Sequence, residues 1–319
     1  MSDQLKTRKA SDLKAAQGSN DANYSVQSPK KIKFEPCMLL QMFNALLILK
    51  ITHENHSLFA EIFNRDMYEL DEAIRCSIIA HDSFWVSFGY SLLENAVEAG
   101  LTSVVKLLLK HADTDIAILI NEGCQLLVSC MRGYIEITQL LLEHGADPNL
   151  SGKGRFSNKT CLSVACTGAN SSLAALLLKY GANPNFCCLT AAPLLLEAIS
   201  NSKIDIVKLL LEHGADANVT SPDQNTPIAS ACFEGYLEVA TLLLDYGADI
   251  NAVDKDGDTP LLLAVRGRRP DKDLVQLLLE RGADISLLNN EGCTALQYTD
   301  KGSELAQMII NAQLEPILK

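Results

Sequence analysis

Ten cysteines and six histidines are the residues of this 319-residue chain whose side chains could bind a metal ion or act as nucleophile and base. Cys187 and Cys188 are adjacent, and nothing near them completes the four ligands of a zinc site. His53 and His56 lie far along the chain from His81 and form no ligand set with it. The sequence also has no phosphate-binding glycine loop, nucleophile elbow or paired carboxylates. We therefore predict no catalytic residue, no metal and no cofactor.

The other cysteines and histidines recur at matching positions of a repeated pattern, which favours a structural role. Three cysteines occupy one position, where other copies carry Val or Ile: Cys130, Cys166 and Cys232. A position shared with Val and Ile is a small site in the core. Three histidines occupy another position, where other copies carry Tyr or Arg: His111, His144 and His213. These histidines follow the end of an expected helix, where they can bond free carbonyl oxygens.

The elements that position these residues are units of about 33 residues. A phrase such as His213-Gly-Ala-Asp-Ala-Asn occurs six times, at steps of 33, 36, 33, 33 and 35 residues. In one unit, Thr226-Pro227 precedes a short apolar helix that Gly235 ends, and a second helix follows before Gly247. A fixed period of this length indicates a stack of small units rather than one globular core.

Thr259-Pro260-Leu261 and Thr226-Pro227-Ile228, together with the Gly-Ala-Asp phrases at this spacing, resemble ankyrin repeats. The resemblance covers about residues 57–312. It implies an all-α fold, an ankyrin-repeat solenoid of stacked helix-turn-helix units with hairpin-like inter-repeat turns. The His that usually follows Thr-Pro-Leu in the family is replaced here by residues such as Ser163, Leu262 and Gln297. This departure predicts an array less stable than a consensus one.

The pattern divides the chain into four regions. The first is polar and basic, with too few apolar residues to offset the entropy of ordering it. The regions are a disordered basic tail (1–33), an N-terminal helical cap with a degenerate ankyrin-like repeat (34–90), an array of about seven units including a C-terminal cap (91–312), and a short tail (313–319). Two insertions interrupt the period, within 152–157 and 266–272, and insertions in solenoids often lie at the binding face.

Charge and hydropathy indicate where the protein works. Residues 1–36 carry seven Lys or Arg against four Asp or Glu, whereas the remainder carries 20 against 35. Such an acidic body argues against nucleic-acid binding, which rests on neutralising phosphates. The longest apolar run, Cys37–Ile51, is shorter than the roughly 20 residues that span a bilayer. We expect a monomer without membrane or nucleic-acid partners, in the cytoplasm and also in the nucleus. The basic Ser28-Pro-Lys-Lys segment could be a phosphorylation site or a weak nuclear-import signal, and a solvated basic tail is the other explanation for it.

The resemblance implies a non-catalytic module for protein–protein interaction that acts as an adaptor, scaffold or inhibitor through the concave face of the array. It does not name the partner. An alternative remains open: the chain could be an effector or regulatory enzyme subunit with its activity in residues 34–90.

Ankyrin-like arrays bind partners through the tips of the inter-repeat turns and the first helices. The residue types enriched at interfaces, with neighbouring charged residues, occupy these places. The candidate partner-binding residues are Phe88, Tyr90, Met131, Arg132, Phe156, Lys159, Leu189, Phe233, Glu234, Asp256 and Arg266. The resemblance also implies hydroxylation candidates, because asparagines follow the Gly-Ala-Asp or Gly-Ala-Asn phrase as in hydroxylated family members: Asn149, Asn185, Asn218 and Asn251. A hydrogen bond within the turn is the other explanation for these asparagines.

Overall fold

The computed structural model describes residues 70–71, 74, 90–111, 120–121, 124–152, 159–186 and 193–318, with the backbone alone described for 90 and 315–318. All of them belong to one compact unit, Pro36–Lys319. The described residues form thirteen α-helices and one 3-10 helix, and no strand. The all-α prediction is confirmed.

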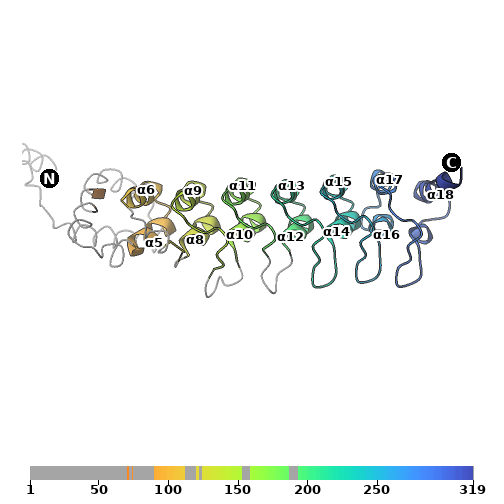
Figure 1. Ribbon diagram of the computed structural model, residues 1–319, viewed down its shortest axis with the longest axis horizontal. Helices are drawn as coiled ribbons and strands as arrows, with labels where there is room; N and C mark the ends of the chain where they lie inside the picture. Colours follow the sequence, from red (N-terminus) through yellow and green to blue (C-terminus); the bar gives the residue numbers. More distant parts are fainter. Residues whose placement is uncertain are drawn as a thin grey trace, which may run out of the picture. The chain divides into compact units, whose positions relative to one another are not determined.

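The helices alternate between two rows, and helices of the same row contact each other in chain order (Figure 1). The row of first helices is α5 (Tyr90–Glu98), α8 (Gln125–Arg132), α10 (Cys161–Thr167), α12 (Leu194–Ser200), α14 (Pro227–Glu234), α16 (Pro260–Arg266) and η3 (Ala295–Tyr298). The row of second helices is α6 (Thr102–Lys110), α9 (Ile135–Glu143), α11 (Ser171–Lys179), α13 (Ile204–Glu212), α15 (Leu237–Asp245), α17 (Lys272–Glu280) and α18 (Glu304–Leu318).

The unit around α14 shows why this sequence folds as two helices. Thr226 precedes α14, and its Oγ1 accepts a hydrogen bond from the amide of Ala229 at 3.2 Å. Such a cap satisfies one of the free amides at the helix N-terminus. Gly235 ends the helix with φ 76°, a left-handed conformation that costs glycine least. Helix α15 then runs to Asp245, and Gly247 follows it with φ 83°. The helix-turn-helix interpretation of this unit is confirmed.

The core lies between the two rows of helices. Val207 and Leu210 of α13 and Val239 and Leu243 of α15 are almost fully buried at the helical spacing that the sequence predicts. All three cysteines of the repeated position are buried: Cys130, Cys166 and Cys232. Burial raises the pKa of the Cys166 thiol to about 12 and that of Cys232 further. Because the thiolate is the reactive form, these two residues are inert parts of the core.

The Asp and Asn of the repeated phrase join one unit to the next. Asp216 Oδ1 accepts a hydrogen bond from the amide of Asn218 at 2.8 Å, which shapes the turn. The Asn218 side chain then reaches the following unit, where Oδ1 accepts from the amide of Asp249 at 2.7 Å and Nδ2 donates to the carbonyl of Gly247 at 2.9 Å. Two further asparagines make the same pair of bonds, Asn149 and Asn185. The side chains of this phrase therefore link adjacent units by hydrogen bonds.

The histidines of the phrase have two different roles. Nδ1 of His144 and of His213 lies 2.8 and 2.9 Å from a carbonyl oxygen one turn earlier in its own helix, as the sequence predicts. His111 instead places Nε2 2.6 Å from the carboxylate of Asp71. This hydrogen bond is the main cause of a lowered pKa of Asp71. His111 thus links the first described helix pair to a residue of the N-terminal region.

Two of the residues that replace the family's usual His make capping bonds of their own. Ser163 Oγ accepts from the amide of Thr160 at 3.0 Å, and Gln297 Oε1 accepts from the amide of Thr294 at 2.7 Å. Both units therefore close a capping box by another route. In the last unit, α18 continues to Leu318, past the boundary at 312 that the sequence suggests.

Candidate functional site

The structure describes eight of the eleven candidate partner-binding residues, and Phe88, Phe156 and Leu189 lie outside the described residues. Tyr90 is the first residue of α5. Met131 and Arg132 end α8 with exposed side chains, and Lys159 is exposed just before α10. The other four candidates lie around one hollow, between α14, α16 and the loops that precede them: Phe233, Glu234, Asp256 and Arg266.

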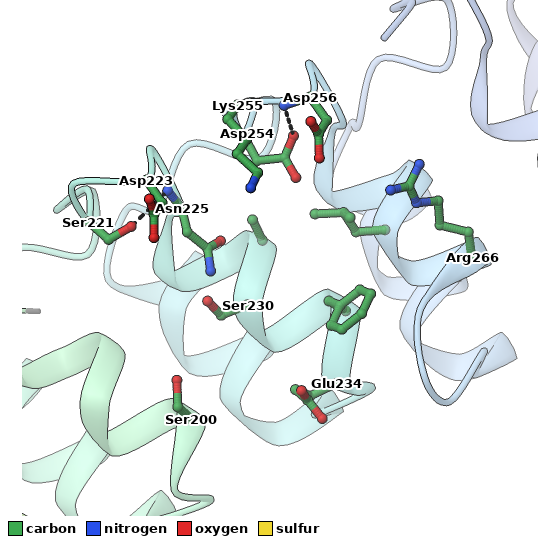
Figure 2. A pocket seen from close by; sticks show the side chains of 13 residues that line it. Ser200, Ser221, Asp223, Asn225, Ser230, Glu234, Asp254, Lys255, Asp256 and Arg266 are labelled. Carbon is green, nitrogen blue, oxygen red and sulfur yellow. Dashed lines mark hydrogen bonds between the residues drawn. The ribbon is translucent and has the colours of Figure 1, made fainter. Parts of the chain in front are cut away.

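The hollow has a volume of about 510 Å³ and is formed by three successive units. Figure 2 shows Asp223 on one loop and Asp254 and Asp256 on the next, with Glu234 at the far end of α14. The apolar part of the lining is formed by Phe233, which is 36% exposed, and by Leu263 of α16. The arrangement combines an exposed aromatic ring with carboxylates from two loops.

Arg266 lines the hollow and also forms an ion pair within the fold. Its Nη2 lies 2.8 Å from Oδ2 of Asp258, whose side chain is fully buried. The guanidinium carbon also lies 5.5 Å from the centre of the Tyr298 ring, a cation–π contact with the last unit. Oδ1 of Asp258 accepts from Asn289 Nδ2 at 2.8 Å. Burial nevertheless raises the pKa of Asp258, because these partners do not fully replace water.

The insertion after α16 lies against the end of α14. The Arg268 guanidinium carbon is 5.8 Å from the centre of the Phe233 ring, and Nη1 is 3.1 Å from the Glu234 carboxylate. Both interactions are partly exposed and individually weak, since the Arg268 side chain is 68% exposed. Together they place a cation of this chain beside the aromatic ring of the hollow.

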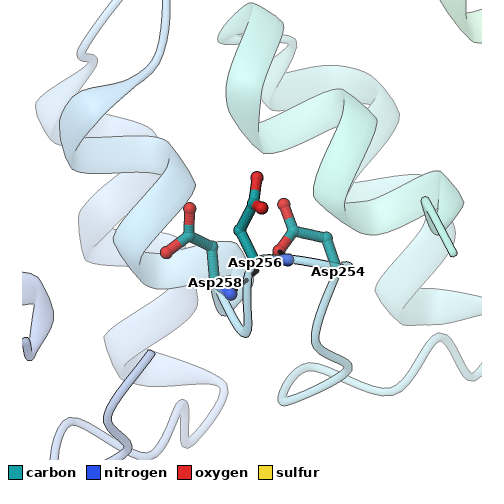
Figure 3. Close-up of side chains that lie close together, drawn as sticks. All are labelled: Asp254, Asp256 and Asp258. Carbon is teal, nitrogen blue, oxygen red and sulfur yellow. Dashed lines mark hydrogen bonds between the residues drawn. The ribbon is translucent and has the colours of Figure 1, made fainter. Parts of the chain in front are cut away.

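Three aspartates on the loop before α16 lie close enough to share a ligand, with carboxylate oxygens within 4.8 Å of one another (Figure 3). Asp254 Oδ1 accepts two hydrogen bonds of 2.9 Å, from the amides of Asp256 and Asp258. Asp258 is held by Arg266 and Asn289. The protein's own donors thus satisfy two of the three carboxylates, and the cluster is explained as a turn rather than a metal site.

The sequence did not single out several residues of the hollow. Asp223 and Ser221 come from the loop before α14, Asp254 from the loop before α16, and Ser230 and Leu263 from the helices. The period of 33 residues is the signal that could have found them, because equivalent positions of adjacent units become neighbours.

No helix within the described ranges combines the length and hydropathy needed to cross a membrane. The described cysteines are all free thiols. The hydroxylation candidates Asn149, Asn185 and Asn218 form hydrogen bonds to the next unit, and Asn251 Oδ1 likewise accepts from the amide of Asp284 at 2.9 Å. Their hydroxylation stays a prediction.

Family models for ankyrin repeats match most of the described chain. A model of three ankyrin repeats matches residues 93–188, 126–221 and 162–254, and a single-repeat model matches residues 256–290. Among solved structures, the crystal structure of the human ASB11 ankyrin repeat domain is similar in fold, with a TM-score of 0.51 and 24% identity over 69% of this chain and 96% of that one. No curated protein sequence matches the chain significantly.

Proposed function

Because the chain belongs to the ankyrin-repeat family, we propose that it is a non-catalytic adaptor, scaffold or inhibitor that holds a partner protein against its first helices and inter-unit loops. Ankyrin repeats are modules for protein–protein interaction, and the family match indicates this role for the chain. Binding would use a preformed surface, so the entropy lost on association would be modest.

The observation that supports this proposal is that repeated and variable residues have different environments. The repeated Asp and Asn of each phrase are bonded within the scaffold, as Asp216 and Asn218 are. In two units, a variable position in the last turn of the first helix instead carries an exposed apolar side chain, Met131 at 42% and Phe233 at 36% exposure. Aromatic residues and Met are enriched at interfaces, and stabilising the stack does not require them there.

The role is tested by recovering partners from the native cell with the full chain, followed by comparison of two fragments. We expect residues 91–319, checked for helix content by circular dichroism, to retain the partner that the full chain recovers. Residues 1–90 should recover none. Recovery of the partner by 1–90 alone, or a catalytic activity carried by that fragment, would favour the rival role for residues 34–90, of which only 70–71, 74 and 90 are described.

We propose a monomer located in the cytoplasm and also in the nucleus, with no nucleic-acid partner. Light scattering and imaging of a tagged full-length chain test the first two. Mass spectrometry of the chain from its own cell tests hydroxylation at Asn149, Asn185, Asn218 and Asn251.

A further inference from the structure

The hollow beside α14 carries an uncompensated negative charge. Asp223, Asp254 and Asp256 line it from two loops, and none of them has an ion-pair partner among the residues that the structure describes. Two cations also line it, Lys255 and Arg266. Arg266 is neutralised by the buried Asp258 at 2.8 Å, which leaves Lys255 alone against three carboxylates.

The walls of the hollow suit the stem of a long side chain. Phe233 and Leu263 provide an apolar surface between the two acidic loops and the end of α14. The volume of about 510 Å³ falls within the range of roughly 300–1,000 Å³ that is typical of ligand pockets. Long cationic side chains bury their methylene stem on apolar surface while the charged end reaches polar groups.

Arg268 shows which cation the neighbouring surface accommodates. Its guanidinium lies over the Phe233 ring at 5.8 Å and beside the Glu234 carboxylate at 3.1 Å, but Arg268 itself does not line the hollow. A planar guanidinium can stack on an aromatic ring and bond two carboxylate oxygens at once, whereas an ammonium acts as a point charge.

We propose that the hollow receives an arginine side chain from an extended segment of a partner protein. The stem lies against Phe233 and Leu263, and the guanidinium reaches the carboxylates of Asp223 and Asp256. This inference rests on the proposed interaction role and specifies the chemistry of the partner.

The test presents the immobilised full chain with a random dodecapeptide library displayed on phage. We expect the selected peptides to share one arginine position. The double variant Asp223→Asn, Asp256→Asn keeps the shape of both side chains, and neither carboxylate accepts a hydrogen bond from the residues that the structure describes, in contrast to Asp254. It should bind the selected peptides at least tenfold more weakly.

A matched control removes the same charge from the second helices, at Glu136→Gln and Asp273→Asn, both exposed. The control should bind the peptides as the unmodified chain does. A coupled measurement replaces the peptide arginine by glutamine, and this change should cost about tenfold on the unmodified chain but little on the Asp223→Asn, Asp256→Asn variant.

The inference is overturned if the library yields no binder, if the shared position is lysine or not basic, or if the hollow variant and the control bind equally. Equal binding would leave the interaction role intact and remove only the arginine site. Failure of the full chain to recover any protein from its cell would instead count against the interaction role itself.

Discussion

The backbone amide of Arg268 donates a hydrogen bond of 2.8 Å to the carbonyl oxygen of Phe233. This bond fastens the insertion after α16 to the last turn of α14, one unit earlier. Two glycines allow the two segments to approach this closely. A Cβ on Gly235 would come within 2.6 Å of the Arg269 carbonyl oxygen, and a Cβ on Gly267 within 2.4 Å of the Phe233 carbonyl oxygen. The insertion is therefore packed against α14, and its Arg268 guanidinium lies beside the Phe233 ring.

The close approach at Gly267 predicts a steric cost for alanine. Gly267→Ala should lower the free energy of unfolding by about 1–3 kcal/mol, because the new methyl group meets two backbone oxygens that cannot move aside. Gly168→Ala is the matched control, since Gly168 also follows a first helix with a negative φ and its Cβ would meet its nearest atom at 3.1 Å. Urea unfolding followed by circular dichroism measures both. Equal midpoints for the two variants would contradict the account of the insertion.

The two hydrogen bonds from the Asn218 side chain to the next unit predict a loss of stability when this side chain is removed. Asn218→Ala removes hydrogen bonds to both Asp249 and Gly247, for a loss of about 1–2 kcal/mol. Asn201→Ala provides the comparison, because the Asn201 amide bonds only the Glu197 carbonyl of its own helix. Thermal unfolding of the three proteins should rank Asn218→Ala lowest. A ranking in which Asn201→Ala is equally damaging would argue against a role of the phrase between units.

Exposure of Phe233 predicts an effect on binding. Phe233→Ala should weaken binding of the recovered partner by more than about 1 kcal/mol, the scale of interface hot spots, while the helix content stays unchanged. Tyr246→Ala is the control, because Tyr246 is 46% exposed but follows a second helix. Calorimetric titration with the purified partner distinguishes them. Unchanged affinity in Phe233→Ala would remove this residue from the interface.

Burial of Asp258 predicts a pH dependence. Its raised pKa means that the folded chain keeps this proton to a higher pH than the unfolded chain. The stabilisation from this group is therefore complete below its ordinary pKa of about 4 and declines as pH rises through the raised pKa. In Asp258→Asn the decline should be absent, so the stability difference between unmodified chain and variant should shrink or reverse with rising pH. A difference that grows with pH would contradict the sign of the shift.

The sequence predicts the helices well because their signals are local. Thr226 as cap, Gly235 as terminator and the apolar spacing of α15 act within a few residues of one another. The structural role of Cys166 and Cys232 also follows from the repeat, because the Val and Ile residues that share their position, Val97, Ile199 and Val265, are buried as well.

The site is less predictable because its residues come from different units. The sequence predicts that Arg266 contacts a partner, but its guanidinium is paired with Asp258, whose other carboxylate oxygen accepts a hydrogen bond from Asn289 in the following unit. Asp223 is not predictable from the sequence, because a single aspartate in a loop gives no signal until the fold places Phe233 and Asp256 around the same hollow. The sequence indicates which residue types are suited to an interface, and the packing between units determines which of these side chains can contact a partner.

A bound partner should cover the first helices and the loops around α14. Hydrogen–deuterium exchange of the full chain, alone and with its recovered partner, measures this coverage. We expect new protection in peptides that cover residues 219–234 and 252–266, with exchange in α13 and α15 unchanged. Protection confined to the second helices, or none in 219–266, would contradict it.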